Sequence, residues 1–249
     1  LDASRVSEWE ESDRLVLPDP LTPSLYWDFE HLEGDAVSGF GGSLSGLTDG
    51  AGIEPGEGIG ESRTGLEFNG PHEGLELSCD AGLNCQPQSG LTLSLWVRPG
   101  AGSGERTSVL YEQGGYWRGL NLILERGWLL AAGWNRPANE SDWQGTTLYG
   151  GRLIEGEWNH IALVLDGTET LQEDVLSLYL NGELVASGAG SMLWAQGDAT
   201  GIGQVQGATV YRGREVRALD PFVGGMDDLT IWKKPISQTD LERTILASF

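Results

Sequence analysis

The chain has 249 residues, of which 39% are hydrophobic, and its ten Trp add large apolar area, so it can bury a sizeable core. Its net charge of −22 predicts that nucleic acid and anionic membrane surfaces are repelled. No segment approaches the roughly eighteen consecutive apolar residues that a membrane-spanning helix needs, so we expect no membrane insertion.

The chain divides into an arm and one folded unit. Residues 1–20 are charged and then punctuated by Pro18 and Pro20, which is typical of an arm or linker. Residues 21–249 are predicted to form a single domain.

Short apolar runs alternate with turn residues along this unit. Residues 25–29 are expected to be the first strand, and residues 34–60 a long Gly- and acid-rich loop with at most one weak strand. The clearest strand covers residues 91–97, where every second residue is apolar. Further strands are predicted at 66–68, 75–77, 108–111, 120–124, 128–132, 158–165, 201–203 and 226–232.

Two local signals are especially strong. Asn181-Gly182 lies between the apolar runs 176–180 and 183–186, and this dipeptide suits the positive φ angles of a type I′ hairpin turn. Near the end of the chain, Ser237 resembles the N-cap of a short helix. The sequence therefore predicts an all-β fold, a two-sheet antiparallel jelly-roll sandwich with one short C-terminal helix.

Cys79 and Cys85 are the only cysteines. The glycine and asparagine between them permit a loop that brings the two Cα atoms to about 5–6 Å, as a disulfide needs. A disulfide would indicate an oxidising compartment, and the alternative is a pair of free thiols in a cytosolic protein.

Acidic residues crowd the first third of the chain. They are interpreted either as a surface tuned for solubility or as a concentration of oxygen ligands for Ca²⁺.

Several segments, in order, resemble one known family. They read LTLSLWVRP at 91–99, EWNHIALVLDG at 157–167, LYLNGELV at 178–185 and FVGGMDDLTIW at 222–232, and YWDF at 26–29 is similar to the opening strand. This pattern resembles the laminin-G-like jelly rolls, which are related to pentraxins and concanavalin A-like lectins. The resemblance implies the jelly-roll fold without naming a ligand, because the fold hosts lectins, adhesion modules and glycosidases.

The resemblance also implies a structural calcium ion. Carried over from the family, the ligands would be Asp227, Asp35 and backbone oxygens near Ser38 and Gly39. Ca²⁺ prefers six to eight hard oxygens, which a Gly-rich loop can supply. The alternative is that Asp227 accepts backbone N–H bonds at a strand end. Because neighbours on a strand point to opposite faces, only one of Asp227 and Asp228 is expected to reach a shared site.

Aromatic side chains beside polar groups indicate a possible sugar site, because a sugar ring needs a stacking face and hydrogen bonds. The candidate ligand-binding residues are Tyr116, Trp117, Trp134, Asn135 and Trp143, with Trp134 and Trp143 in predicted loops. Four other Trp on predicted strands are expected in the core, namely Trp27, Trp96, Trp158 and Trp232.

Catalytic motifs are not apparent. No predicted strand carries the Glu-x-Asp-x-x-Glu pattern of glycosidases with this fold, and His31, His72 and His160 form no H-E-x-x-H motif.

We therefore expect a non-catalytic, Ca²⁺-assisted recognition module of a larger secreted, periplasmic or cell-surface protein. Its expected partner is a glycan or an extracellular protein. The alternatives are a glycoside hydrolase or polysaccharide lyase, and a structural adhesion spacer.

Overall fold

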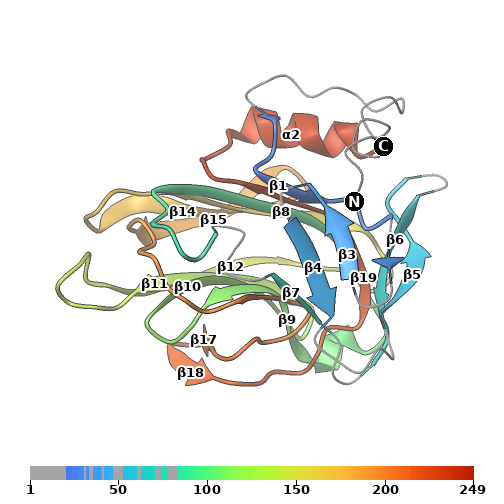
Figure 1. The fold of residues 1–249 in the computed structure, drawn as a ribbon, viewed down its shortest axis with the longest axis horizontal. Helices are drawn as coiled ribbons and strands as arrows, with labels where there is room; N and C mark the ends of the chain where they lie inside the picture. The colour runs from blue at the N-terminus through green and yellow to red at the C-terminus, as the bar shows by residue number, and fades with distance from the viewer. Residues whose placement is uncertain are drawn as a thin grey trace.

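The computed structural model describes residues 21–30, 32–33, 36–40, 42–46, 53–60, 63–70, 74–77 and 83–249. Two large antiparallel sheets face each other in a sandwich, and one α-helix follows the last strand of the described chain (Figure 1). The predicted all-β jelly-roll sandwich with a C-terminal helix is confirmed. None of the helices in the described ranges is long and apolar enough to cross a bilayer.

Sheet A is the eight-stranded sheet, with the order β15-β14-β13-β8-β19-β6-β5 and β1 paired to β19. Its strands are β1 (Leu25–Trp27), β5 (Ile53–Glu57), β6 (Thr64–Phe68), β8 (Gly90–Pro99), β13 (Asn159–Asp166), β14 (Gln172–Leu180), β15 (Glu183–Gly190) and β19 (Gly224–Trp232).

Sheet B is the nine-stranded sheet, with the order β12-β11-β10-β9-β16-β7-β4-β3-β2. Its strands are β2 (Leu32–Glu33), β3 (Ala36–Gly39), β4 (Gly42–Gly46), β7 (Leu75–Leu77), β9 (Thr107–Gly114), β10 (Arg118–Glu125), β11 (Trp128–Asn135), β12 (Trp143–Arg152) and β16 (Thr200–Ile202).

The main core lies between the two sheets. Alternate residues of β8, from Leu91 to Val97, are almost fully buried in it, as their spacing predicted. Alternate residues of β10, from Leu120 to Leu124, belong to the same cluster from sheet B. Side chains one position away on each strand therefore point to the two outer faces of the sandwich.

The two strong local predictions are confirmed. Asn181 and Gly182 have φ angles of 52° and 83° and connect β14 to β15, as a type I′ turn requires. Helix α2 (Gln238–Ala247) begins at Ser237, whose side chain accepts a hydrogen bond from the Asp240 N–H at 3.2 Å.

The sequence analysis missed strands in two segments that it expected to be mainly loop. The segment 34–60 holds β3, β4 and β5, and the chain from 135 to 152 includes β12. These strands are rich in glycine or polar residues, so their composition does not favour extended structure. Pairing with neighbouring strands supplies their backbone hydrogen bonds regardless of composition.

Each sheet is covered on its outer side. Helix α2 packs over sheet A through a small apolar cluster that includes Leu241, Trp232 and Leu21. A hairpin that the sequence did not predict, β17 (Thr209–Tyr211) with β18 (Arg214–Val216), packs on sheet B. Figure 1 shows the helix and the hairpin on opposite sides of the sandwich.

Candidate functional site

A pocket of about 320 Å³ lies between the outer face of sheet A and the C-terminal end of α2, and we call it the α2 pocket. Three adjacent strands form its floor, because β13, β8 and β19 are hydrogen-bonded neighbours. The described lining residues are Thr22, Pro23, Tyr26, Arg63, Ser94, Trp96, His160, Asp228, Thr230, Trp232, Thr244, Ala247 and Ser248.

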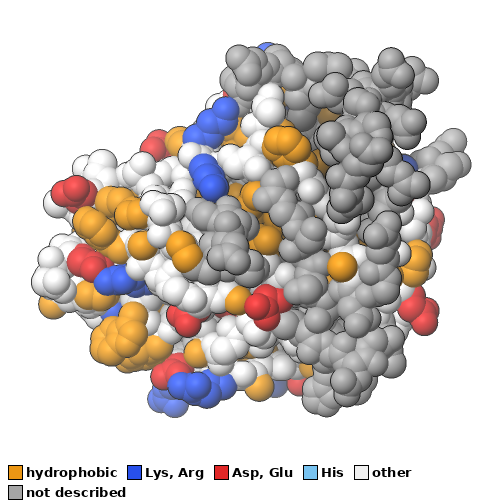
Figure 2. Space-filling model, in the orientation of Figure 1, with side chains coloured by type: hydrophobic (Ala, Val, Ile, Leu, Met, Phe, Trp, Pro, Cys, Tyr) orange, Lys and Arg blue, Asp and Glu red, His pale blue; other side chains and the backbone are white. Residues whose placement is uncertain are grey.

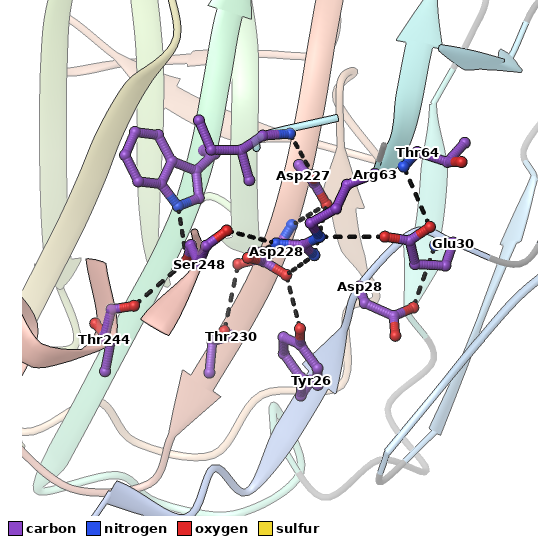
Figure 3. Close-up of polar contacts among 12 residues, drawn as sticks. Tyr26, Asp28, Glu30, Arg63, Thr64, Asp227, Asp228, Thr230, Thr244 and Ser248 are labelled. Atoms are coloured by element: carbon purple, nitrogen blue, oxygen red, sulfur yellow. Dashed lines mark hydrogen bonds and ion pairs between the residues drawn. The ribbon is translucent and has the colours of Figure 1, made fainter. Parts of the chain in front are cut away.

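Arg63 joins the acidic side chains at one edge of the pocket (Figure 3). Its Nη1 and Nη2 donate to the two carboxylate oxygens of Asp228 at 3.0 and 2.8 Å, and its Nε donates to Glu30 Oε1 at 3.2 Å. Nη1 also donates to the Ser248 carbonyl at 3.0 Å, which attaches the end of the chain to the same cluster. Although burial opposes it, the hydrogen bonds to Asp228 raise the pKa of Arg63 above its ordinary value.

Asp227 and Asp228 both approach Arg63, contrary to the expectation that only one of them could reach a shared site. Arg63 Nη2 lies 2.8 Å from Asp228 Oδ1 and 3.8 Å from Asp227 Oδ1. Asp228 has a φ of 48°, and the register of β19 against β8 shifts between Asp227 and Thr230. This bulge breaks the strict alternation of side chains, which is why both acids serve one site.

Asp227 is fully buried and hydrogen-bonded to the backbone. Its Oδ2 accepts from the Ile59 N–H at 2.9 Å, and its Oδ1 accepts from the Asp228 N–H at 2.7 Å. Burial, followed by the neighbouring Asp228 carboxylate, raises the pKa of Asp227 to about 7. The backbone-accepting role considered for this residue is therefore present.

The described part of the proposed calcium site does not fit a calcium ion. Both oxygens of Asp227 already accept N–H bonds, and the cationic Arg63 lies close to one of them. Within the described ranges, no group of three or more His, Cys, Asp and Glu could hold a metal. Asp35 lies outside the described residues, while Ser38 and Gly39 lie on β3, so the Asp35 loop stays a prediction.

The predicted disulfide also extends beyond the described chain. Cys79 lies outside the described residues, whereas Cys85 lies inside them. The pairing of Cys79 with Cys85 stays a prediction.

Ser94 and His160 meet on the pocket floor. Ser94 Oγ lies 2.6 Å from His160 Nε2, and the imidazole packs edge-on to Trp96 with ring centroids 5.2 Å apart. Burial lowers the pKa of His160 to about 4, so the ring is neutral at physiological pH. The sequence placed His160 in no catalytic motif, and the pairing with Ser94 becomes visible when β8 and β13 are placed side by side.

The predicted sugar-binding residues separate into two groups. Tyr116 and Trp117 lie in the turn between β9 and β10, and the Trp117 side chain is 63% exposed. Trp134 and Trp143 lie on β11 and β12 and are 1% exposed, so their predicted loop placement is wrong. Asn135 is also fully buried, where it donates to Ser141 Oγ at 3.1 Å.

Glycines explain the burial of the two indoles. A Cβ on Gly119 would lie 2.7 Å from the Trp134 ring, and a Cβ on Gly133 would lie 2.4 Å from the Trp143 ring. Only glycine leaves room for an indole at such close range. The apolar run that continues from residue 128 to residue 134 was the sequence signal for Trp134, and no comparable signal marked Trp143.

The other Trp predictions are largely confirmed. Trp27, Trp96 and Trp232 are buried on strands. Trp158 differs, because it precedes β13, is only half-buried and lies 5.3 Å from the guanidinium of Arg98.

The comparison with family models decides the family. Residues 72–242, well over half of the chain, match the Laminin_G_3 model of the concanavalin A-like lectin/glucanases superfamily. The chain belongs to this superfamily. No curated protein matches the chain at a significant level.

Several solved structures share the fold of this chain, and some of them are complexes with saccharides. The receptor-binding domain of botulinum neurotoxin D matches with a TM-score of 0.61 and 11% identity, over 90% of this chain and 52% of that one. Domain 4 of AbnA, an extracellular arabinanase from Geobacillus stearothermophilus in complex with arabinotriose, matches with a TM-score of 0.58 and 17% identity, over 89% and 97%. Trypanosoma rangeli sialidase in complex with sialic acid matches with a TM-score of 0.60 and 12% identity, over 98% and 38%.

These similarities concern the fold, since the identities are low. The chain spans about half the length of the neurotoxin domain and nearly the whole of the arabinanase domain. Among these neighbours are both binding domains and glycoside hydrolases, so the fold alone does not decide between binding and catalysis.

Proposed function

We propose that this superfamily member is a non-catalytic glycan-recognition domain of a secreted, periplasmic or cell-surface protein, and that the α2 pocket receives the saccharide. The observation that carries the proposal is the composition of the pocket, where aromatic rings and hydroxyl groups converge on one cavity. A sugar ring requires this combination, because its C–H face stacks on aromatic carbon and its hydroxyls need hydrogen-bond partners.

The pocket supplies both kinds of contact. Tyr26, Trp96 and Trp232 line it with aromatic surface, while Thr230 and Ser248 add hydroxyl groups. Its volume of about 320 Å³ is at the lower end of the range for small-ligand sites, which suits one or two sugar rings rather than a long oligosaccharide.

The structural neighbours support the ligand class. The arabinanase domain is in complex with arabinotriose, and both the sialidase and a botulinum neurotoxin D ligand-binding domain are in complex with a sialic acid. Two unrelated kinds of saccharide on one architecture favour a glycan for this domain without favouring a particular sugar.

Two acidic residues have raised pKa values, and their burial supports a binding function over a catalytic one. Asp227 and Glu112 have their pKa values raised to about 7 and about 9, chiefly by burial, as a general acid would require. Both are 0% exposed, however, and a glycosidase acid must touch the glycosidic oxygen. Asp228 borders the pocket, but Arg63 and Tyr26 occupy its carboxylate.

The proposal is tested by filling the pocket. Ala247 lines it from α2, whereas Leu246, the preceding residue, is 74% exposed. The Ala247→Trp variant should lose saccharide binding by at least about tenfold, because the indole occupies the cavity, and the matched Leu246→Trp variant should bind like the parent chain. Binding is measured on a glycan array and then by calorimetry with the saccharides that bind.

Other outcomes would reject the proposal. Absence of binding to every glycan would favour an adhesion spacer, and equal binding by Ala247→Trp and the parent chain would exclude this pocket. Release of shortened saccharides during incubation would favour the hydrolase or lyase alternative.

A further inference from the structure

The β17–β18 hairpin is the part of the described surface where cations gather most densely. Residues 211–217 contain three arginines, Arg212, Arg214 and Arg217, against one acid, Glu215, in a chain whose net charge is −22. All three arginines are exposed. Figure 2 shows Lys and Arg side chains grouped along the lower edge of the molecule, where Figure 1 places β17 and β18.

Sheet B holds this hairpin in a fixed position. Asn121 Nδ2 donates to Thr209 Oγ1 at 3.0 Å and to the Val210 carbonyl at 2.8 Å. The Val210 side chain is buried against sheet B, and the turn residues Arg212 and Gly213 have φ angles of 49° and 77°. The arginines are therefore presented from a pre-organised element, which lowers the entropic cost of binding a ligand.

Arg136 connects the hairpin to the exposed aromatic turn. Its Nη2 donates to the Gly213 carbonyl at 3.4 Å, and its guanidinium lies 4.5 Å from the centre of the Tyr116 ring. Tyr116 in turn packs edge-on to Trp117, with ring centroids 5.0 Å apart. A stacking surface for a sugar ring thus adjoins the cationic hairpin.

Two arginines of this surface lack a carboxylate partner in the described chain. Arg63, Arg98, Arg118 and Arg243 each contact at least one carboxylate. On this surface Arg212 pairs with Glu125 and Arg217 pairs with Glu215, whereas Arg136 and Arg214 have no carboxylate within 4.0 Å in the described ranges. Their guanidinium groups therefore remain available for an external anion, which a planar guanidinium binds in bidentate fashion.

The surface extends along the sheet. Trp128, which is 52% exposed, lies directly opposite the exposed Arg152 in the register of β11 with β12. Trp128 and Arg136 stand at opposite ends of β11, about 25 Å apart for an extended strand of this length. This spread matches a chain of several charged sugars better than one monosaccharide.

We propose that the β17–β18 hairpin, together with Arg136, Trp117 and Trp128, forms a second binding site, for an acidic polysaccharide that carries carboxylate or sulfate groups. Arginine binds either anion, and the Trp rings stack on the sugars between the charged groups. The acidic remainder of the surface repels a polyanion and directs it to this face. The site lies on the opposite side of the sandwich from the α2 pocket, so the two sites are independent (Figure 1).

The test uses calorimetry on the intact chain with polygalacturonate, heparin and neutral dextran. Polygalacturonate carries only carboxylates, whereas heparin carries carboxylates and sulfates, so binding of heparin alone would indicate that the sulfate is required. At least one of them should bind, dextran should bind more weakly, and the affinity should fall by about tenfold or more between low and high salt. The double variant Arg214→Ala/Arg217→Ala should lose about tenfold in affinity, as should Trp117→Ala.

Controls keep this site separate from the α2 pocket. Arg243→Ala, an exposed arginine on α2, should bind the polysaccharide like the parent chain. Ala247→Trp should also retain polysaccharide binding. If the α2 pocket proves not to bind a saccharide, the test of the hairpin site is therefore unaffected. Equal binding of dextran, full affinity in the double variant, or tighter binding of single-stranded DNA would each overturn the proposal.

Discussion

Glu112 projects from β9 on the outer side of sheet B, directly opposite Asn121 on β10. Its Oε1 accepts from the Gln206 N–H at 2.8 Å, while its Oε2 and the Asn121 Oδ1 are buried without a hydrogen-bond donor in the described ranges. Burial raises the pKa of Glu112 to about 9, so the carboxyl holds a proton at neutral pH.

The raised pKa of Glu112 predicts how the free energy of unfolding depends on pH. The ordinary pKa of the carboxyl, 4.5, applies in the unfolded chain, so between about pH 4.5 and pH 9 the folded chain binds one more proton than the unfolded chain. The contribution of Glu112 to the free energy of unfolding therefore falls as pH rises through this window.

Glu112→Gln should remove this dependence, because the amide is neutral at every pH. Thermal melts should show the variant more stable than the parent at pH 8, by at least about 1 kcal/mol, and little different at pH 4.5. The exposed Glu183→Gln serves as the matched control and should change neither midpoint. An equal effect of Glu112→Gln at both pH values would contradict the assignment.

At the scale of single elements, α2 forms the upper wall of the α2 pocket, and its docking depends on one apolar side chain. Leu241 is 0% exposed and packs with Trp232, Ile236 and Leu21. The N-cap at Ser237 fixes where the helix begins, and Arg63 contacts Ser248 just beyond its end. The position of the pocket wall is thus set at three points along the helix.

Leu241→Ala should lower the free energy of unfolding by about 3 kcal/mol, since it leaves a cavity in this cluster. The exposed Leu246→Ala, on the same helix, should cost less than about 0.5 kcal/mol. Urea unfolding followed by Trp fluorescence measures both. Similar losses of free energy of unfolding in the two variants would mean that the packing of Leu241 does not hold the helix against the sheet.

At the scale of the whole molecule, the predicted calcium ion would affect the stability of the entire sandwich. If the Asp35 loop binds Ca²⁺ only in the folded state, added Ca²⁺ should raise the melting midpoint above that in EDTA, by about 5 °C for a domain of this size. Asp35→Ala should abolish the difference, and Mg²⁺ should not reproduce it. If the parent chain melts at the same midpoint in Ca²⁺ and in EDTA, the calcium prediction is wrong.

Much of the architecture was predictable because its signals are local. Alternation along β8, the Asn181-Gly182 turn and the Ser237 cap each act within a few residues, so the sequence alone located them. Strands β5 and β12 were missed because their extended form depends on hydrogen bonds to distant partners rather than on their own composition.

The site was less predictable than the fold. The sequence wrongly assigned Trp134 and Trp143 to loops, because it did not reveal that Gly119 and Gly133 make room for buried indoles. Arg63 went unnoticed, since its partners Glu30 and Asp228 lie 33 and 165 residues away. Likewise, the net charge of −22 gave no indication that cations gather on the β17–β18 hairpin.

The sequence by itself determined that the chain forms an antiparallel sandwich with a terminal helix, because residue periodicity and turn chemistry are properties of neighbouring residues. Only the tertiary structure decided which aromatic rings are exposed, which acids keep a proton and where the arginines gather. Those properties depend on the side chains that sheet pairing brings together from distant parts of the chain, and on how much water they exclude.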